Sequence, residues 1–504
     1  MMLRHGPLTP AGGTRAGHTL SPAGGTQAGC ASACGERPEA NAACASGLDH
    51  MQDDDHPRDE CGVLGLFNVP DAARVAALGL HALQHRGQES AGIAVSHEGT
   101  LSCHRGMGLV SRVFGQGEAQ AMPGLHAVGH VRYSTTGSSS FVNAQPLLGR
   151  YIGGEVALAH NGNLAASKRL NYSLCATGAL FQTTTDSEIF LHLLAQEQAT
   201  DAKEIARVLS LAGSAFAVVM LFPDRLIAAR DPLGFRPLAL GRLKEGWVAA
   251  SESCAFDQIG ASFEREIEPG EMVVCDAQGC RSLYFGERGR RARCLLELIY
   301  FARPDSLVFG ETPHLFRQRS GEALAREHPA DVDIVVAIPD SGVSAGMGFA
   351  RGIGRPLDRG LIRNHYIGRS FIAPGQEARA AAVRMKHNVV REVVRGKRVA
   401  LVDDSLIRGT TTAALGGELR AAGALEVHLR IACPPTRHPC IYGVDFPRRE
   451  ELMAHNHSLE EIRKRLDMDS LGYLSLEGIT GLFGKDCDSF CTACWSGSYP
   501  VLEE

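Results

Sequence analysis

The sequence predicts a chain of mixed class, in which an α+β N-terminal half is followed by an α/β C-terminal half. From Cys61 onward, short apolar strands alternate with glycine turns. Further along, continuous apolar runs at 333–338 and 398–402 each lead through a polar loop into helical sequence, the pattern of a buried parallel sheet. Residues 1–50 differ from both halves, because they are rich in Gly, Ala and Pro and poor in large apolar side chains.

Composition and charge exclude several classes of protein. The 504 residues are 44% hydrophobic and 21% charged, which suits a globular chain of about three domains. The net charge of −5 argues against a nucleic-acid coat protein, and no apolar run approaches the ~18 residues of a membrane helix. The 15 cysteines are too dispersed for a secreted disulfide scaffold, and they indicate a reducing cytoplasm with one or two functional thiols and a metal centre.

Residues 1–50 cannot bury enough apolar surface to offset the entropy of folding. They contain a near-repeat, in which residues 9–17 are echoed by residues 21–29. A disordered tail, an organelle targeting segment and an untranslated extension with Met51 as the true start are the three alternatives, and we favour the third. Residues 51–60 then form a short acidic leader that ends directly before Cys61.

Local patterns predict three further elements of the N-terminal half. A helix over Leu80 ends at a glycine turn and is followed by a strand. A strand from Leu158 runs into an Asn-Gly turn, and residues 184–188 give the next helix a polar start of the capping type. Polar side chains therefore gather at the ends of several strands in this half.

The residues around Cys61 are suited to act on a free amino acid. A cysteine at a strand start is usually a core residue. To act as a nucleophile, it also needs a base, an oxyanion donor and groups that hold the substrate. Removal of the leader would give Cys61 a free α-amine, which titrates near ~8 and accepts the thiol proton. Asn161 and the Gly162 N–H are candidates for an oxyanion hole, Arg132 for an α-carboxylate fork and Asp186 for an α-ammonium contact.

Five ordered motifs give this half a family resemblance. They lie at 61–65, 85–92, 130–135, 160–164 and 185–188. Together with 231–238 and 251–253, they resemble the N-terminal-nucleophile glutamine amidotransferases. The resemblance implies an αββα sandwich over 61–290, in which Cys61 attacks the glutamine side-chain amide and releases ammonia. It also implies that Asn161 and Gly162 form the oxyanion hole, that Arg132 and Asp186 bind glutamine, and that His85 and Arg86 lie close by.

A loop in the C-terminal half has the features of a ribose and phosphate site. Asp403 and Asp404 follow the apolar run at 398–402, where paired carboxylates accept hydrogen bonds from vicinal hydroxyls or hold Mg²⁺. The N–H groups and hydroxyls that follow lie at a predicted helix N-terminus, which suits a phosphate monoester. The residues of this segment are Ser405, Arg408, Gly409, Thr410, Thr411 and Thr412.

This loop resembles the 5-phosphoribosyl 1-pyrophosphate (PRPP) loop of type I phosphoribosyltransferases. The resemblance implies a parallel-sheet phosphoribosyltransferase domain over 291–504. It implies that Asp403 and Asp404 bind the ribose hydroxyls and that the Ser/Thr end of the loop binds the 5-phosphate. Asp340 and Ser341 would then belong to the pyrophosphate loop that follows the apolar run at 333–338.

The segment between the two loops is open to two interpretations. Residues 366–376 are punctuated by Gly and Pro, and residues 384–387 are basic. The segment is either an exposed loop or a flexible lid that excludes water from the site. We favour the lid, in which Arg384 and Lys386 close over PRPP.

A glutaminase joined to a phosphoribosyltransferase resembles the amidophosphoribosyltransferases, and the resemblance runs from Cys61 to the C-terminus. It implies the first committed step of purine (IMP) synthesis, in which PRPP, glutamine and water give 5-phosphoribosylamine, glutamate and pyrophosphate. Ammonia would reach the PRPP site through an internal channel that protects it from water and protonation. The family also implies feedback inhibition by purine nucleotides and a homodimer or homotetramer, without nucleic-acid or membrane partners.

Four cysteines resemble the ligands of the iron–sulfur subgroup of this family. Cys491 and Cys494 have a C-x-x-C spacing suited to one cluster, and Cys294 and Cys440 lie in stretches that match the subgroup. The subgroup implies one structural [4Fe–4S] cluster and a cleaved propeptide, here 51–60. Zinc on four thiolates is the rival metal. The rival ligands are Cys433 and Cys487.

Two other functions remain as alternatives. An amidotransferase that aminates a sugar phosphate would share the glutaminase half, but such enzymes carry a sugar isomerase domain in place of the PRPP loop. A PRPP-sensing purine regulator would keep the loop at 403–405, but it uses a DNA-binding domain, and nothing in this sequence resembles a basic helix-turn-helix. Release of ammonia from glutamine distinguishes the enzyme from the regulator.

Overall fold

A computed structural model of the chain describes residues 61–133, 139–286, 289–364, 386–446 and 448–502. The N-terminal tail, the acidic leader and most of the predicted lid, including Arg384, lie outside these ranges. All of the described residues belong to one structural unit. Within them, no helix has both the length and the apolar character needed to cross a membrane.

The N-terminal half contains two antiparallel sheets. The seven-stranded sheet has the order β11–β9–β10–β1–β4–β2–β3, and the six-stranded sheet has the order β13–β12–β8–β7–β6–β5. The first sheet is made of β1 (Gly62–Phe67), β2 (Ser90–His97), β3 (Thr100–Met107), β4 (His126–Arg132), β9 (Ala239–Leu243), β10 (Gly246–Ala250) and β11 (Ser262–Glu266). The second is made of β5 (Leu147–Tyr151), β6 (Gly154–Gly162), β7 (Phe216–Leu221), β8 (Leu226–Arg230), β12 (Glu271–Asp276) and β13 (Gly279–Tyr284).

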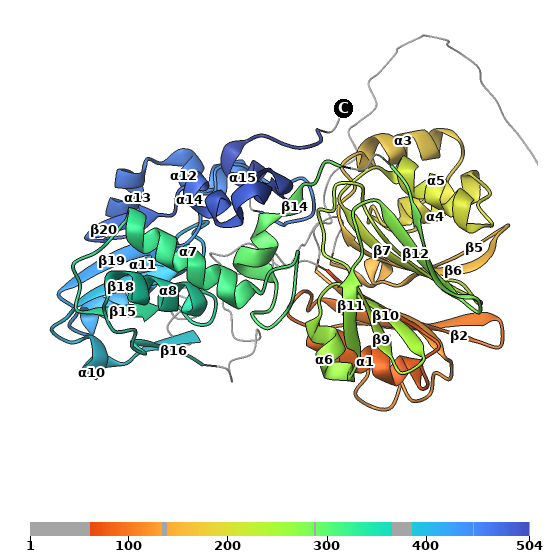
Figure 1. Ribbon diagram of the computed structural model, residues 1–504, viewed down its shortest axis with the longest axis horizontal. Coiled ribbons are helices and arrows are strands. Elements are labelled where there is room, and N and C mark those ends of the chain that lie inside the picture. The colour runs from red at the N-terminus through yellow and green to blue at the C-terminus, as the bar shows by residue number, and fades with distance from the viewer. Residues whose placement is uncertain (1–60, 134–138, 287–288, 365–385, 447, 503–504) are drawn as a thin grey trace, which may run out of the picture. The chain divides into compact units, whose positions relative to one another are not determined.

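Helices cover the outer face of each sheet, as Figure 1 shows. One apolar cluster joins the seven-stranded sheet to its helices, and another joins the six-stranded sheet to the helices on its own side. The first set is α1 (Ala72–Ala82), α2 (Val110–Val113) and α6 (Cys254–Ile259), and the second is α3 (Ser167–Ala176), α4 (Glu188–Gln196) and α5 (Ala202–Ala212). The layer order is αββα, as the family resemblance implies.

Strand β1 is central to the packing of the two sheets. It pairs with β10 on one side and β4 on the other, and all six of its residues are buried. Gly65 lies where the two sheets pack tightly, since a Cβ added there would come within 2.7 Å of Val219 Cγ1 on β7. Burial on both faces explains why this strand has a continuous apolar sequence, and it places Cys61 at the edge of the sandwich core.

The C-terminal half is built on a four-stranded parallel sheet of order β15–β18–β19–β20. Its strands are β15 (Ile334–Ala337), β18 (Arg398–Asp403), β19 (Glu426–Ile431) and β20 (Ser470–Tyr473). The helices are α7 (Pro313–Glu327), α8 (Val343–Ile353), α10 (Arg391–Val394), α11 (Thr410–Ala421), α12 (Met453–Asn456), α13 (Leu459–Arg465), α14 (Leu476–Thr480) and α15 (Ala493–Ser496). The apolar runs that predicted parallel strands are confirmed as β15 and β18.

Several short elements complete the described chain. Two small ladders are β14 (Arg293–Cys294) with β21 (Phe490–Cys491), and β16 (Leu361–Arg363) with β17 (His387–Val389). A π-helix, η2, spans Glu297–Phe301. The 3₁₀ segments are η1 (Phe141–Asn143), η3 (Arg449–Glu451) and η4 (Gly481–Ser489).

Three local predictions are corrected by the structure. The helix over Leu80 already begins at Ala72 and ends at Ala82. The Asn161–Gly162 pair is not a turn, because both residues continue β6 and pair with β7. Helix α4 has no side-chain cap at Ser187, whose hydroxyl instead contacts Gln145 and His160. A disulfide between Cys275 and Cys280 joins β12 to β13, and this pairing was not predicted from the sequence.

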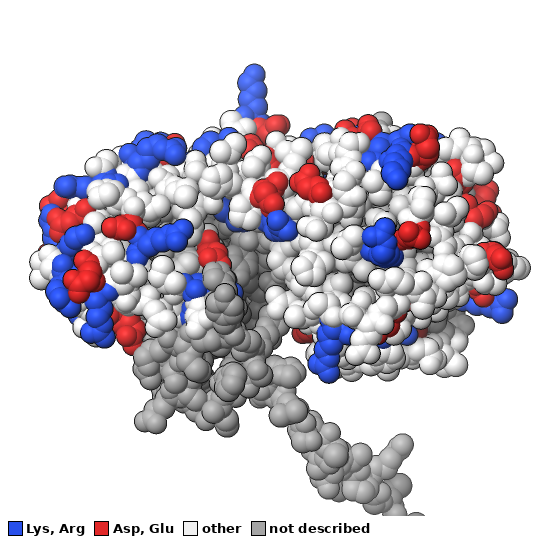
Figure 2. All heavy atoms as spheres, turned by 90° about the horizontal axis from the view of Figure 1, so that it is seen from below, with Lys and Arg blue, Asp and Glu red and all other residues white. Residues whose placement is uncertain are grey.

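Charged side chains of both signs are interspersed on the face shown in Figure 2. Many of the described surface charges form ion pairs, for example Arg351 with Glu322 at 2.6 Å and Arg398 with Asp331 at 2.7 Å. Solvent and salt screen exposed pairs of this kind, so they contribute little to stability. The charges that matter for the architecture are therefore the buried ones.

Candidate functional site

Cys61 lies directly before β1, with its thiol buried. The side chain is close to Arg132 at the end of β4, and Cys61 Sγ is 3.4 Å from the carbonyl oxygen of Tyr133. Burial raises the pKa of the Cys61 thiol to about 11, although the positive charge of Arg132 acts in the opposite direction. That value already includes the negative charges of Glu89 and Asp186, which also raise the pKa. The structure therefore brings Cys61, Arg132 and Asp186 together, and it keeps the thiol protonated at neutral pH unless a base is present.

The end of β6 carries the predicted oxyanion hole. Asn161 is 1% exposed, and its amide Nδ2 has no hydrogen-bond partner among the described residues. Gly162 has φ +131°, and a Cβ there would come within 2.1 Å of the carbonyl oxygen of Ala215. A buried donor without an acceptor costs about 1–3 kcal/mol, so this site suits an acceptor that arrives with the substrate. A developing oxyanion is such an acceptor.

The two predicted glutamine contacts are both buried and charged. Arg132 Nη1 lies 3.5 Å from Glu89 Oε2, with 3% of the arginine side chain exposed. Asp186 Oδ2 accepts a hydrogen bond of 2.7 Å from the backbone N–H of Leu164, two residues beyond Gly162. One cation and one carboxylate near the thiol match the two charged groups of an amino acid.

A polar network behind this pocket was not predicted. Gln145 Oε1 accepts a hydrogen bond of 2.8 Å from the backbone N–H of His160, and Gln145 Nε2 donates to Ser187 Oγ at 3.0 Å. Ser187 Oγ also contacts His160 Nδ1 at 2.9 Å. These contacts join the residue before Asn161 to the residue after Asp186. No spacing in the sequence signals them, because Gln145 lies far from both motifs.

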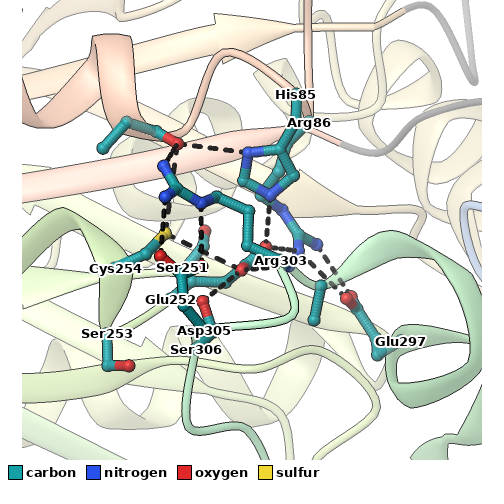
Figure 3. A network of polar contacts seen from close by, with 12 residues as sticks. His85, Arg86, Ser251, Glu252, Ser253, Cys254, Glu297, Arg303, Asp305 and Ser306 are labelled. Atoms are coloured by element: carbon teal, nitrogen blue, oxygen red, sulfur yellow. Dashed lines mark hydrogen bonds and ion pairs between the residues drawn. The ribbon is translucent and has the colours of Figure 1, made fainter. Parts of the chain in front are cut away.

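Arg86 is the centre of a buried charge network shown in Figure 3. Its Nε donates to the carbonyl oxygen of Cys61 at 3.0 Å. Its Nη1 contacts Glu252 Oε1 at 2.6 Å, and its two Nη atoms contact Glu297 at 3.0 and 2.8 Å. Burial alone would raise the pKa of Glu252, but His85 and Arg86 hold it well below its usual range. Glu252 lies in the motif at 251–253, whereas no motif in the sequence pointed to Glu297.

The predicted PRPP loop lies at the carboxyl end of β18. Asp403 is the last residue of that strand, and Asp403 and Asp404 are each 1% exposed. Ser341 Oγ donates to Asp403 Oδ1 at 3.2 Å, and Ser405 Oγ donates to Asp404 Oδ1 at 2.6 Å. The structure therefore joins the predicted pyrophosphate loop to the acidic pair through Ser341. Such a position at the ends of parallel strands is where ligands bind in open α/β sheets.

The far end of the loop leads into α11. Gly409 precedes the helix with φ +78°, and Thr410 and Thr411 are its first two residues. Arg408 pairs with Glu451, with 3.0 Å between Nε and Oε2. The helix has 12 residues, so its N-terminus presents backbone N–H groups and a favourable dipole to an anion.

A cavity of about 550 Å³ adjoins the predicted pyrophosphate loop. Asp340 lines it and pairs with Arg363, with 3.1 Å between Oδ2 and Nη1. Lys386 lies at the edge of the described chain, where its carbonyl oxygen accepts a hydrogen bond from Asn364 N at 2.8 Å. The cavity lining is Ala337, Pro339, Asp340, Val343, Met347, Leu357, Asp358, Arg359, Leu361, Ile362 and Arg363.

The four predicted cluster cysteines lie together. Cys294 and Cys491 are paired across the β14–β21 ladder, and both line one narrow apolar cavity with Cys440 and Cys494. The rivals Cys433 and Cys487 are not among its lining residues. Within the described ranges, no group of three or more His, Cys, Asp or Glu side chains is placed so that it could hold a metal ion.

The type of these donors, though not their placement, fits an iron–sulfur cluster. The pKa of the Cys294 thiol is raised to about 12, mainly by burial, with Arg236 acting in the opposite direction and Glu297 and Cys440 adding to the increase. Burial also raises the pKa of the Cys494 thiol, and the charges of Cys491 and Cys294 contribute in the same direction. Four buried thiolates would repel one another, so a bound metal group would supply the compensating positive charge. The apolar lining suits a [4Fe–4S] cluster held by four cysteines.

An αββα sandwich with a buried cysteine, followed by a parallel sheet with an acidic loop, defines a glutaminase joined to a phosphoribosyltransferase. Residues 130–258 match the model of a glutamine amidotransferase domain. The chain is 47% identical over 462 residues to the chloroplastic amidophosphoribosyltransferase of Vigna aconitifolia, with 90% of this chain and 94% of the relative covered. It is 44% identical over 449 residues to the amidophosphoribosyltransferase of Bacillus subtilis (strain 168), with 88% and 94% covered.

A solved structure gives the same result. The glutamine PRPP amidotransferase from B. subtilis, complexed with ADP and GMP, matches with a TM-score of 0.83 and 44% identity, and the match covers 87% of this chain and 97% of that chain. The chain therefore belongs to the amidophosphoribosyltransferase family. As such it is a glutamine amidotransferase and pentosyltransferase of purine biosynthesis, which converts PRPP, glutamine and water to 5-phosphoribosylamine, glutamate and pyrophosphate.

The raised pKa of Cys61 predicts how its reactivity depends on pH. In the full-length chain, alkylation of Cys61 by iodoacetamide should be slow at neutral pH and rise about tenfold per pH unit toward pH 11, because only the thiolate reacts. In a chain that begins at Cys61, the α-amine accepts the proton and alkylation is already fast at pH 8. Peptide mass spectrometry measures both rates, with exposed Cys175 as the internal control. Equal Cys61 rates in the two chains would contradict a role of the α-amine as base.

Proposed function

We propose that Cys61 is the nucleophile of the glutaminase reaction and that it acts as the first residue of a mature chain. The proposal rests mainly on four groups that lie together: the buried thiol before β1, Arg132 at the end of β4, the unpaired Asn161 amide near the end of β6, and Asp186 just before α4. The α-amine takes the thiol proton, and the thiolate attacks the side-chain carbonyl of glutamine. Asn161 Nδ2 and the Gly162 N–H donate to the resulting oxyanion. The α-ammonium returns its proton to the amide nitrogen, and ammonia leaves as the thioester forms. Water then releases glutamate.

The Arg132 guanidinium holds the α-carboxylate of glutamine, and the Asp186 carboxylate holds its α-ammonium. Both contacts are nearly sheltered from water, so each is stronger than the same pair on the surface. Removal of the acidic leader 51–60 is part of this proposal, since the α-amine does not exist in the full-length chain.

The transferase site binds PRPP at the carboxyl ends of β15 and β18. Asp403 and Asp404 bind the ribose hydroxyls, and Asp340 and Ser341 bind the pyrophosphate. The 5-phosphate lies on the segment of Ser405, Arg408, Gly409, Thr410 and Thr411 at the start of α11. Asp403 and Asp404 are also the residues that would hold Mg²⁺, which would neutralise charge on the departing pyrophosphate. Lys386 and Arg384 belong to the proposed lid, and Arg384 lies outside the described residues.

Ammonia from Cys61 reaches ribose C1 through the interior of the protein. We place the boundary between the two domains near residue 290, between β13 and β14. Cys294, Cys440, Cys491 and Cys494 hold one [4Fe–4S] cluster, which would tie the C-terminal segment to the rest of the chain. The dispersed cysteines favour a cytoplasmic enzyme. Purine nucleotides are the proposed feedback inhibitors, since a relative of solved structure binds ADP and GMP, and the proposed assembly is a homodimer or homotetramer.

Separate substitutions test the division of labour between the two sites. Cys61→Ala should abolish synthesis from glutamine and leave synthesis from ammonia within about twofold, because the nucleophile is needed only to release nitrogen. Asp404→Asn should lower PRPP turnover at least about tenfold with either nitrogen source, because a charged contact to ribose or metal is lost. Pyrophosphate release is the common assay. A Cys61→Ala enzyme that still uses glutamine would refute the nucleophile, and unchanged PRPP kinetics in Asp404→Asn would refute the loop.

The cluster proposal predicts a measurable metal content. Anaerobically purified protein should contain about four irons per chain and absorb near ~400 nm. Cys494→Ser should lose most of this iron, whereas Cys487→Ser, which removes a thiol outside the cavity, should keep it. Iron and zinc are measured by plasma mass spectrometry. A colourless protein with one zinc per chain would replace the cluster with a structural zinc site.

A further inference from the structure

The carbonyl oxygen of Cys61 is held by a buried arginine. Arg86 is 1% exposed, and its Nε donates to Cys61 O at 3.0 Å. This oxygen belongs to the peptide that joins Cys61 to Gly62, so the hydrogen bond restricts rotation of that peptide. The orientation of the Cys61 Cα follows from it, and both the thiol and the α-amine are attached to that atom.

The two carboxylates around Arg86 have different surroundings. Glu252 also accepts from His85 Nε2 at 2.8 Å, from Ser306 Oγ at 2.7 Å and from the backbone N–H of Arg303 at 2.9 Å. Its position is therefore fixed by several groups, as Figure 3 shows.

Glu297 instead directs both carboxylate oxygens to Arg86. Oε2 lies 3.0 Å from Nη1 and Oε1 lies 2.8 Å from Nη2, and Arg236 Nη1 is 3.7 Å from Oε1. A two-point contact of this kind sets the plane of a guanidinium as well as its position. Glu297 therefore determines where the Nε–H of Arg86 points.

Glu297 comes from the C-terminal half of the chain. It is the first residue of the π-helix η2, whose carbonyl groups are bound by Arg317 on α7. Arg317 Nε donates to Leu298 O at 2.9 Å, and Nη2 donates to Ala302 O at 2.8 Å. The carboxylate is thus anchored outside the sandwich that carries Cys61.

We propose that Glu297 is a positioning residue for the glutaminase reaction, which acts through Arg86 on the backbone of Cys61. The proposal rests on the assignment of Cys61 as nucleophile. Glu297 touches neither glutamine nor PRPP in this account. Its loss should therefore slow the attack of the thiolate without weakening the binding of glutamine, and synthesis from ammonia should not need it. A misplacement of about 1 Å costs a reaction about 100-fold.

The test compares Glu297→Gln with the unchanged chain, both prepared anaerobically. The kcat for glutamine hydrolysis should fall about 10- to 100-fold, while the KM for glutamine stays within threefold and synthesis from ammonia within twofold. The rate of Cys61 alkylation at pH 8 should fall with kcat. Glu297→Asp, which keeps the charge on a shorter side chain, should restore part of both rates. Intact mass verifies that Cys61 is the first residue, and iron content verifies the nearby cysteine site.

Glu271→Gln is the matched control. Glu271 is also a carboxylate with 0% side-chain exposure, paired with Arg265 at 2.7 Å, but it lies on β12 and does not contact Arg86 or Cys61. This variant should lower the thermal midpoint and leave kcat and the alkylation rate unchanged. A purely structural role for Glu297 would give the same result.

Three outcomes are decisive. An unchanged kcat and alkylation rate in Glu297→Gln would overturn the inference, as would a raised KM with unchanged kcat, which would indicate substrate binding. If Glu297→Gln does not fold, Glu297→Asp carries the test, and a kcat within twofold of the unchanged chain overturns it. The Cys61→Ala variant keeps the two proposals separate. If Cys61→Ala still hydrolyses glutamine, the assignment of Cys61 as nucleophile is refuted. If Cys61→Ala is inactive but Glu297→Gln has normal kinetics, only the positioning role of Glu297 is refuted.

Discussion

Arg86 is a cation in the interior of the protein, and the structure around Cys61 depends on how its charge is balanced. Arg86, Glu252 and Glu297 all have side chains with 0% exposure. Burial acts to lower the pKa of Arg86, but the two glutamates reverse the shift and raise it above its usual value. Removal of one partner from such a group costs about 3–5 kcal/mol, because an uncompensated charge remains inside. The start of β1, the stretch at 251–253 and η2 are therefore held in one fixed arrangement.

A second set of contacts joins the cysteine cavity to the oxyanion strand. Asn163 Nδ2 donates to Ile441 O at 2.9 Å, and Arg236 Nη2 donates to the carbonyl oxygen of Tyr442. Gly443 lies so close to β6 that an added Cβ would be 2.9 Å from the carbonyl carbon of Gly162. Cys440, a proposed cluster ligand, is only three residues before Gly443, so the proposed cluster and the proposed oxyanion hole are joined by a short stretch of backbone. Loss of the proposed cluster would then disturb the glutaminase site through this backbone connection.

The sequence predicted the fold of the two halves because its signals are local. Cys61 directly precedes an apolar strand and Asp403 ends another, so the pattern predicted where these residues lie in the fold. Their chemical roles stay predictions. The turn at Asn161–Gly162 was wrong because pairing with β7 extends β6 beyond the point where local chemistry favours a turn. Gln145 and Glu297 were missed because each acts on a residue that is distant in the sequence. The Cys275–Cys280 disulfide was missed because its pairing follows from the β12–β13 register rather than from the spacing.

The buried charges at Arg86 are not the most stable way to fill this space. Apolar residues of similar volume in place of a buried ion pair are often neutral or more stable by about 1–4 kcal/mol. Apolar residues, however, cannot donate a hydrogen bond to Cys61 O, and they do not fix the plane of a neighbour as the two oxygens of Glu297 do. An attack by sulfur on an amide carbonyl depends on distance and direction together. The orientation of Cys61 is thus a sufficient physical reason to keep Arg86 and Glu297 buried and charged.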